Sequence, residues 1–221
     1  MDHSGVDIAG DLPQRAVRSQ ALVRVIDGAL PEGLVAAARR AISRLGTARL
    51  AQSYFTTFWL AKGERPRHPV ERAVEALSKR VRPAGCAGAE WWIGRAYTND
   101  VPIEFHFDED VLGKVRRHPR LSSVFFFNRV RGGQLAVTDA VPGKEPSRLE
   151  AVTPRRNRYA IFAGDLLHGV LDRNGETPQK RLAGPRGRLR VTLVVNFWDE
   201  RPSKVLAWSE SRHYRQLAAW R

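Results

Sequence analysis

Residues 122–140, SSVFFFNRVRGGQLAVTDA, contain two apolar runs that are rich in aromatic and β-branched residues and are separated by Gly132 and Gly133. Runs of this kind favour β-strands, and the glycines between them favour a tight connection. Runs of the same texture occupy residues 91–97, 157–163 and 188–198. Several short strands separated by turn residues predict a β-rich core over about 88–200.

The first third of the chain has a mixed α and β pattern. Residues 21–28 and 48–61 are predicted as strands, and residues 31–46 as a helix that starts with proline and has apolar residues at helical spacing. A second proline-led helix, HPVERAVEALSKRV, is predicted from His68 onward. We therefore expect an α+β, mainly β fold with N-terminal helices packed on one sheet.

The composition indicates a single globular domain. The chain has 221 residues, of which 43% are hydrophobic, and its mean hydropathy is −0.39. No apolar run approaches the length of a membrane-spanning helix, about 20 residues, and the N-terminus lacks the pattern of a signal peptide. We expect no membrane association and a cytoplasmic location, with a flexible arm at 1–18 and one domain at 19–221. Cys86 is the one cysteine, which excludes an internal disulfide and a multi-cysteine metal site.

The chain is strongly basic, with a formal net charge of +14. Lysine occurs at only 6 positions, so 31 of the 37 basic residues are arginines, and these are spread along the sequence. A basic surface is compatible with many partners, and no basic segment is interleaved with aromatic residues. Nucleic acid is therefore not the favoured partner.

A candidate metal-binding motif lies at residues 104–110, EFHFDED, which follow an extended stretch. On a strand, residues two apart project from the same face, so His106 and Asp108 can bind one ion. The alternative for this short motif is a surface histidine beside an acidic turn.

A second histidine, His168, lies within AIFAGDLLHGVL, residues 160–171, directly after a β-rich run, a Gly-Asp turn and two leucines. His168 could complete the site, because two imidazoles and one carboxylate form the facial triad that holds non-haem iron(II) and leaves coordination positions open. A structural zinc site would more often be closed by four protein ligands. The sequence therefore indicates a catalytic metal site.

The strand at 188–198 begins with a basic motif, in which Arg190 and Thr192 share a face. Arginine matches a carboxylate with two hydrogen bonds, and the threonine hydroxyl can add another. Arg188 has the same parity and is the second candidate for binding the carboxylate. An exposed basic strand end is the alternative for this motif.

Together, H-x-D at 106–108, the later histidine, R-x-T at 190–192 and the glycine pair at 132–133 resemble the iron(II)- and 2-oxoglutarate-dependent dioxygenases. The similarity is greatest to the prolyl-4-hydroxylase-like branch and covers about residues 90–200. It implies a double-stranded β-helix, a jelly roll with its metal between the two sheets, and a single dioxygenase domain over 19–221.

The resemblance also implies the chemistry of the site. His106, Asp108 and His168 would be catalytic iron(II) ligands, and 2-oxoglutarate and dioxygen would fill the open positions. Oxidative decarboxylation of 2-oxoglutarate would release succinate and carbon dioxide while a C–H bond of the substrate is hydroxylated. The carboxylate of Asp108 favours hydroxylation over halogenation, because halogenating relatives have a small residue there.

The cosubstrate site is implied in the same way. Arg190 would bind the distal carboxylate of 2-oxoglutarate, and Thr192 and Tyr97 would assist it. A core position is the alternative for Tyr97. The polar insertion at 172–187 departs from the family's pattern and keeps Arg188 as an alternative to Arg190.

A peptide or protein side chain is the leading expectation for the substrate, and a free amino acid or small metabolite is the alternative. Arginines in the segments 109–120 and 140–158 could favour an anionic substrate. These arginines are Arg116, Arg117, Arg120, Arg148, Arg155 and Arg156. Two other functions remain: a cupin-type metal enzyme without an acid cosubstrate, and a non-catalytic basic β-sandwich that binds an acidic partner.

Overall fold

The computed structural model describes residues 21–44, 57–97, 104–112, 115–177 and 189–210. The arm expected at 1–18 lies outside these residues. Two helices are present in the described part, α1 (Glu32–Arg44) and α3 (Pro69–Val81), and neither is long and apolar enough to cross a membrane.

The strands form two sheets. The larger one has, in spatial order, β1 (Arg24–Asp27), β7 (Arg158–Ala163), β4 (Leu121–Phe126), β9 (Leu189–Trp198), β3 (Gly88–Tyr97), β2 (Phe58–Ala61) and β10 (Leu206–Ala207). The smaller one has β6 (Leu149–Val152), β5 (Gln134–Thr138) and β8 (His168–Leu171). All neighbouring strands are antiparallel except β2 and β10.

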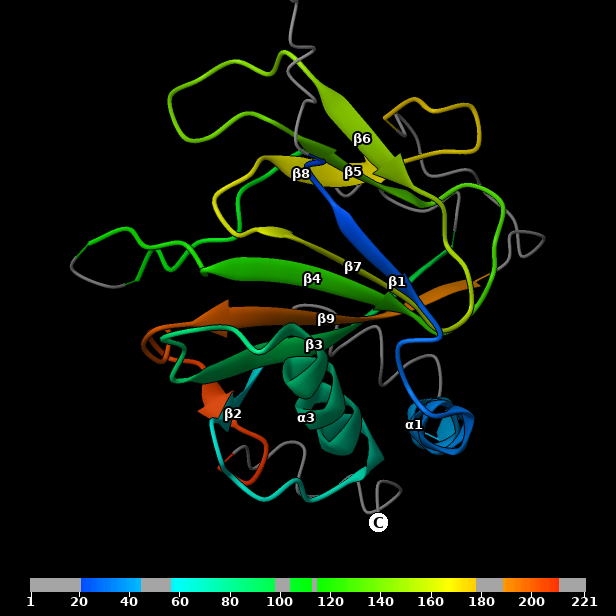
Figure 1. The fold of residues 1–221 in the computed structure, drawn as a ribbon, viewed down its shortest axis with the longest axis vertical. Coiled ribbons are helices and arrows are strands. Elements are labelled where there is room, and N and C mark those ends of the chain that lie inside the picture. Colours follow the sequence, from blue (N-terminus) through cyan, green and yellow to red (C-terminus); the bar gives the residue numbers. More distant parts are fainter. Residues whose placement is uncertain (1–20, 45–56, 98–103, 113–114, 178–188, 211–221) are drawn as a thin grey trace, which may run out of the picture.

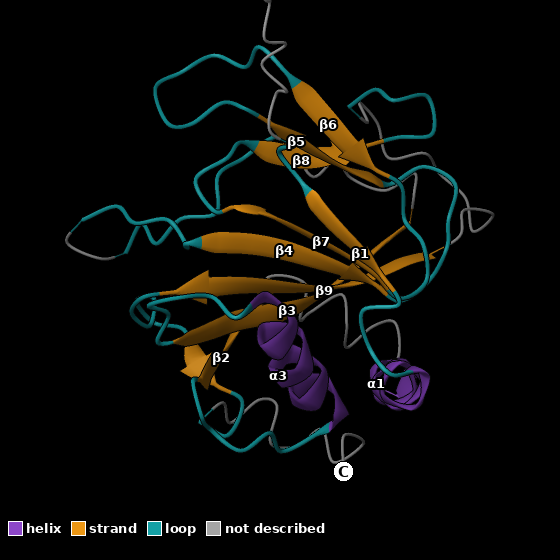
Figure 2. Ribbon diagram, viewed as in Figure 1, coloured by secondary structure: helices purple, strands orange, loops and turns teal. Residues whose placement is uncertain are grey.

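Three layers result from this arrangement. Figure 1 shows the helices on one face of the larger sheet and the smaller sheet on the other. Figure 2, coloured by secondary structure, shows the same separation: the helices lie on the side of the larger sheet that is away from β5, β6 and β8. The mainly β fold with a jelly-roll core, and the packing of the helices on one sheet, are thus confirmed.

The alternation of side chains along β9 separates two apolar clusters. One apolar cluster lies between the larger sheet and the helices, and the odd-numbered residues from Val191 to Phe197 belong to it. The other lies between the two sheets, and Val194 packs against it. Arg190 and Asn196 share the parity of Val194. They therefore face the smaller sheet, on what we call the inner face of the larger sheet.

The helices form where the sequence predicts them. In α3, Pro69 occupies the first turn, and His68 caps the helix because its Nδ1 accepts a hydrogen bond from Glu71 N at 3.3 Å. The buried residues Val70, Val74 and Leu77 form the apolar stripe that packs into the cluster. The predicted strand at 48–61 corresponds to β2 only in its last four residues, and residues 45–56 lie outside the described part.

Candidate metal centre

Two of the predicted ligands are held side by side by backbone hydrogen bonds. His168 is the first residue of β8, and His106 lies opposite it in an isolated antiparallel bridge. The bonds run from His106 N to His168 O at 2.9 Å and from His168 N to His106 O at 3.0 Å. A Cβ at Gly169 would lie 3.2 Å from the Cα of Phe105. This close approach of the two segments explains the glycine that follows His168.

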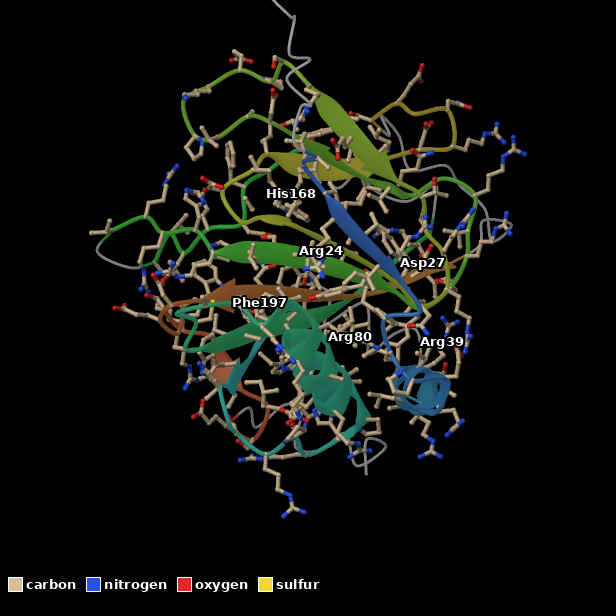
Figure 3. All side chains as sticks on the ribbon, viewed as in Figure 1. Arg24, Asp27, Arg39, Arg80, His168 and Phe197 are labelled. Carbon is tan, nitrogen blue, oxygen red and sulfur yellow. The ribbon has the colours of Figure 1, made fainter. Side chains whose placement is uncertain are left out.

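Asp108 joins the two histidines, so that one ligand atom from each residue lies within 4.8 Å of the others. His168 Nε2 is 3.4 Å from Asp108 Oδ2, and His106 Nε2 is 3.9 Å from Asp108 Oδ1. Two ligands that each bind one ion at about 2.1 Å are at most about 4 Å apart. The two histidine–aspartate distances lie within this limit and so fit ligands of one ion, and Figure 3 shows His168 between the two sheets.

The hydrogen bonds of the imidazoles fix their tautomers. His106 Nδ1 lies 2.8 Å from the carbonyl oxygen of Glu104, and His168 Nδ1 lies 2.9 Å from that of Leu166. A carbonyl oxygen only accepts, so Nδ1 carries the proton in both rings and Nε2 presents its lone pair to the cluster. This orientation by a carbonyl is usual for metal-binding histidines.

Asp108 is oriented from two directions by residues that the sequence analysis did not single out. The hydroxyl of Ser122 donates to Asp108 Oδ2 at 2.7 Å, and His118 Nδ1 donates to the backbone oxygen of Asp108 at 2.9 Å. The carboxylate therefore has a fixed rotamer even before a metal ion binds.

The group formed by His106, Asp108 and His168 is buried on one side and open on the other. The side chains of Asp108 and His168 are 9% and 8% exposed, whereas that of His106 is 44% exposed. Burial lowers the pKa of His168, against the opposing effect of the Asp108 carboxylate. The ring is thus kept neutral, which is the form that binds a metal, and solvent can reach the site past His106.

Arg190 and Thr192 lie on the inner face of β9. Arg190 is 5% exposed, and its Cζ lies 5.3 Å from the ring centroid of Phe126, a residue of the cluster between the sheets. The Thr192 hydroxyl donates to the oxygen of Gly94 at 3.4 Å. The guanidinium of Arg190 is therefore buried in the layer between the two sheets, where the three candidate ligands also lie.

The other cosubstrate predictions fall partly outside the described residues. Tyr97 ends β3, where its backbone is paired with Leu189, and its side chain is outside the described part. Arg188 also lies outside the described residues.

Several arginines expected to favour an anionic substrate are paired with carboxylates. Arg116 lies 3.2 Å from Glu109, and Arg120 lies 3.8 Å from Asp199. Arg117 bridges Asp110, at 3.2 Å, and Glu200. These pairs neutralise much of the positive charge in the segment that follows Asp108.

Comparison with solved structures places this architecture among known folds. A prolyl-4-hydroxylase from Pseudomonas putida superposes with a TM-score of 0.52 at 20% identity, over 80% of this chain and 88% of that one. A prolyl hydroxylase from Trichoplax adhaerens, in complex with a hypoxia-inducible factor peptide fragment, gives a TM-score of 0.53 at 11% identity, over 80% and 84% of the two chains.

The iron-bound HygX from Streptomyces hygroscopicus gives a TM-score of 0.50 at 14% identity, over 88% of this chain and 89% of that one. The chain has the fold of the 2-oxoglutarate- and iron(II)-dependent oxygenases, as found in prolyl hydroxylases. No family model and no curated protein matches its sequence. The predicted fold is therefore supported by architecture rather than by sequence identity.

Proposed function

We propose that the protein is an iron(II)- and 2-oxoglutarate-dependent oxygenase that hydroxylates a C–H bond of a peptide or protein side chain and releases succinate and carbon dioxide. The observation that carries this proposal is the convergence of two imidazole Nε2 atoms and one carboxylate within 4.8 Å, in the layer between the sheets. This donor set is the one that suits non-haem iron(II) with open coordination positions.

The residues fit the ion in protonation as well as in position. In the neutral rings of His106 and His168, Nδ1 donates to a carbonyl oxygen, which leaves Nε2 as the nitrogen that offers its lone pair. Asp108 would supply one negative charge, with its carboxylate held by Ser122. Bound iron(II) and 2-oxoglutarate would supply the activation of dioxygen, and the chain's own residues would position the reactants.

The cosubstrate would be held by the inner face of β9. The buried guanidinium of Arg190 is suited to a carboxylate, because a planar fork of donors matches its two oxygens. Thr192 has the same parity and would add its hydroxyl. Tyr97 is the third residue that we assign to this carboxylate.

A peptide substrate is favoured over a small molecule by two observations. One structural neighbour, the Trichoplax adhaerens prolyl hydroxylase, is in complex with a peptide. The side chain of His106 is 44% exposed, so the ligand set can be reached from solvent on that side. A free amino acid or small metabolite is the second candidate, and an untargeted search for products that gain one oxygen atom distinguishes the two.

Formation of succinate tests the reaction. The wild-type protein should convert 2-oxoglutarate to succinate when iron(II) and dioxygen are present, and His106→Ala or Asp108→Ala should abolish this conversion while the circular dichroism spectrum is unchanged. Asp199→Ala, which removes an exposed carboxylate, is the matched control. Succinate formation that survives in both ligand variants would refute the proposal, and its absence in the wild type would favour the non-catalytic β-sandwich.

A further inference from the structure

A row of polar side chains crosses the inner face of the larger sheet beside the metal ligands. Glu90 of β3 lies directly opposite Asn196 of β9. In the pairing of β4 with β9, Leu121 lies opposite Phe197, so the next residue, Ser122, lies opposite Asn196. The Ser122 hydroxyl donates to Asp108. The row therefore runs from a metal ligand, through Ser122 and Asn196, to Glu90.

Asn196 has an unsatisfied acceptor. The residue is 1% exposed, and its Oδ1 makes no hydrogen bond with any part of the chain that the structure describes. Buried polar atoms are nearly always hydrogen-bonded, so an exception calls for an explanation such as an absent ligand.

Glu90 adds a carboxyl group next to this acceptor. Its Oε2 accepts a hydrogen bond from Trp198 Nε1 at 3.0 Å. The pKa of Glu90 is raised to about 7, chiefly by burial; the negative charges of Asp108 and Asp110 act in the same direction, and the hydrogen bonds from Thr57 and Trp198 oppose them. A nearby positive charge would reverse this shift and ionise the carboxyl group. Glu90 is thus suited to respond to a cation.

An aromatic residue lies on the same face of β3 as Glu90. Trp92 is two residues along the strand and therefore has the same parity, and it is only partly buried. The face of an indole ring attracts cations. By contrast, the arginines nearest in sequence to Asp108 are paired with carboxylates, as described above, which weakens the case for an anionic substrate.

We propose that Glu90 and Asn196 bind a positively charged nitrogen group of the substrate, an ammonium or a guanidinium, and so position the neighbouring carbon at the metal. This inference rests on the proposed oxygenase function. It assigns a cationic substrate. If the substrate is a peptide, it predicts a lysine or an arginine at or beside the oxidised residue.

Paired peptides test this assignment. Wild-type protein with iron(II), 2-oxoglutarate and dioxygen is incubated with a peptide and metabolite library, and products that gain one oxygen atom are identified by mass spectrometry. Each cationic substrate that is oxidised is then compared with its neutral isostere, citrulline for arginine or 2-aminoheptanoic acid for lysine. We expect kcat/KM of the wild type to fall at least tenfold for the isostere, chiefly through a higher KM.

The variant Glu90→Gln should lose this discrimination, because the amide keeps the size of the side chain but cannot ionise. Asn196→Ala should reduce it in the same direction. Glu75→Gln removes an exposed carboxylate from α3 that is paired with Lys79, and it should keep the wild-type ratio. Thermal unfolding of each variant verifies that it is folded.

The outcomes separate the two proposals. Absence of succinate from the wild type refutes the oxygenase function itself, and the inference falls with it. Succinate formation with a preference for neutral or acidic substrates, or with no oxidation of any cationic compound, refutes the cation site alone. An unchanged ratio of cationic to isosteric substrate in both Glu90→Gln and Asn196→Ala also overturns it.

Discussion

Asp108 is held by two separate contacts, one to its carboxylate and one to its backbone oxygen. Ser122 makes the first and His118 the second. Such contacts orient a ligand before the ion arrives, so that less conformational freedom is lost on binding. They can be removed one at a time without removing the ligand.

Substitution of Ser122 by alanine isolates the carboxylate contact. We expect Ser122→Ala to weaken iron(II) binding by about 10-fold to 100-fold, the usual effect of losing a hydrogen bond to a metal ligand. Anaerobic titration with iron(II) measures this change. Ser123→Ala is the matched control, because Ser123 donates to Val195 O and accepts from Tyr159 and does not contact the metal ligands. Equal affinities of Ser122→Ala and wild type would contradict the assigned contact.

Arg190 can be distinguished from Arg188 by their effects on 2-oxoglutarate. We expect Arg190→Met to raise the KM for 2-oxoglutarate at least tenfold, because a buried guanidinium that pairs with the distal carboxylate is lost. Arg190→Lys should recover part of this loss, and Arg188→Met should leave the KM unchanged. Steady-state succinate formation provides the values. A raised KM in Arg188→Met alone would transfer the role to Arg188.

The three candidate ligands were singled out from the sequence, whereas the residues that support them were not. The spacing of two residues suggested that His106 and Asp108 share one face, and the structure brings them together although His106 lies in an isolated bridge outside the named strands. Ser122 and Glu90 become relevant only through the pairing of β3, β4 and β9. Strand parity predicts which residues share a face, but not which residues of distant strands lie opposite each other.

The N-terminus of α3 combines a helix cap with aromatic packing. The ring centroid of His68 lies 4.9 Å from that of Trp208 and 5.5 Å from that of Trp91. Burial lowers the pKa of His68 to about 3, and the charges of Arg72 and Arg67 add to this effect. Since Nδ1 is the acceptor for Glu71 N, the neutral ring is the one that caps the helix.

This cap predicts a pH dependence of stability. Between about pH 6.5 and 3 the unfolded chain protonates His68 and the folded one does not, so this group's contribution is full above pH 6.5 and is lost as the pH falls. Its slope is at most about 1.4 kcal/mol per pH unit. His68→Asn keeps a cap acceptor but not the titration, so its free energy of unfolding should fall less steeply from pH 7 to 4. Urea unfolding measures both curves, and parallel curves would contradict the prediction.

The turn between β7 and β8 depends on a close approach at Gly164. A Cβ there would lie 2.0 Å from the oxygen of Pro119, the residue after His118. We expect Gly164→Ala to lower the free energy of unfolding by about 1–3 kcal/mol and to weaken iron binding, because it separates the segments that carry Asp108 and His168. Gly33→Ala, where a Cβ meets nothing within 4 Å, is the control and should be neutral or slightly stabilising. Unchanged stability of Gly164→Ala in urea unfolding would be the contrary result.

Long elements were predicted better than short ones. Proline at the helix start and apolar residues at helical spacing located α1 and α3, and β4, β5, β7 and β9 coincide with the predicted runs. The sequence analysis did not predict β6, β8 or β10, which have four, four and two residues. Such short segments show too little hydrophobic periodicity to be recognised in the sequence, and they become strands through hydrogen bonding to neighbouring strands.

The layers of the molecule divide stability from chemistry. One face of the larger sheet packs against the helices through an extensive apolar cluster, whereas the other face carries Arg190, Asn196 and Ser122 among a smaller apolar cluster. The candidate metal ligands come from β8 and from the segment before β4, so both sheets must be in place to assemble them. Global unfolding and loss of the site should therefore occur together.

Anaerobic titration of the wild-type protein with iron(II) tests the ligand assignment most directly. We predict binding of about one iron(II) per chain, and loss of this binding in each of His106→Ala, Asp108→Ala and His168→Ala with an unchanged circular dichroism spectrum. No binding to the folded wild type, or wild-type binding retained by all three variants, would contradict the account.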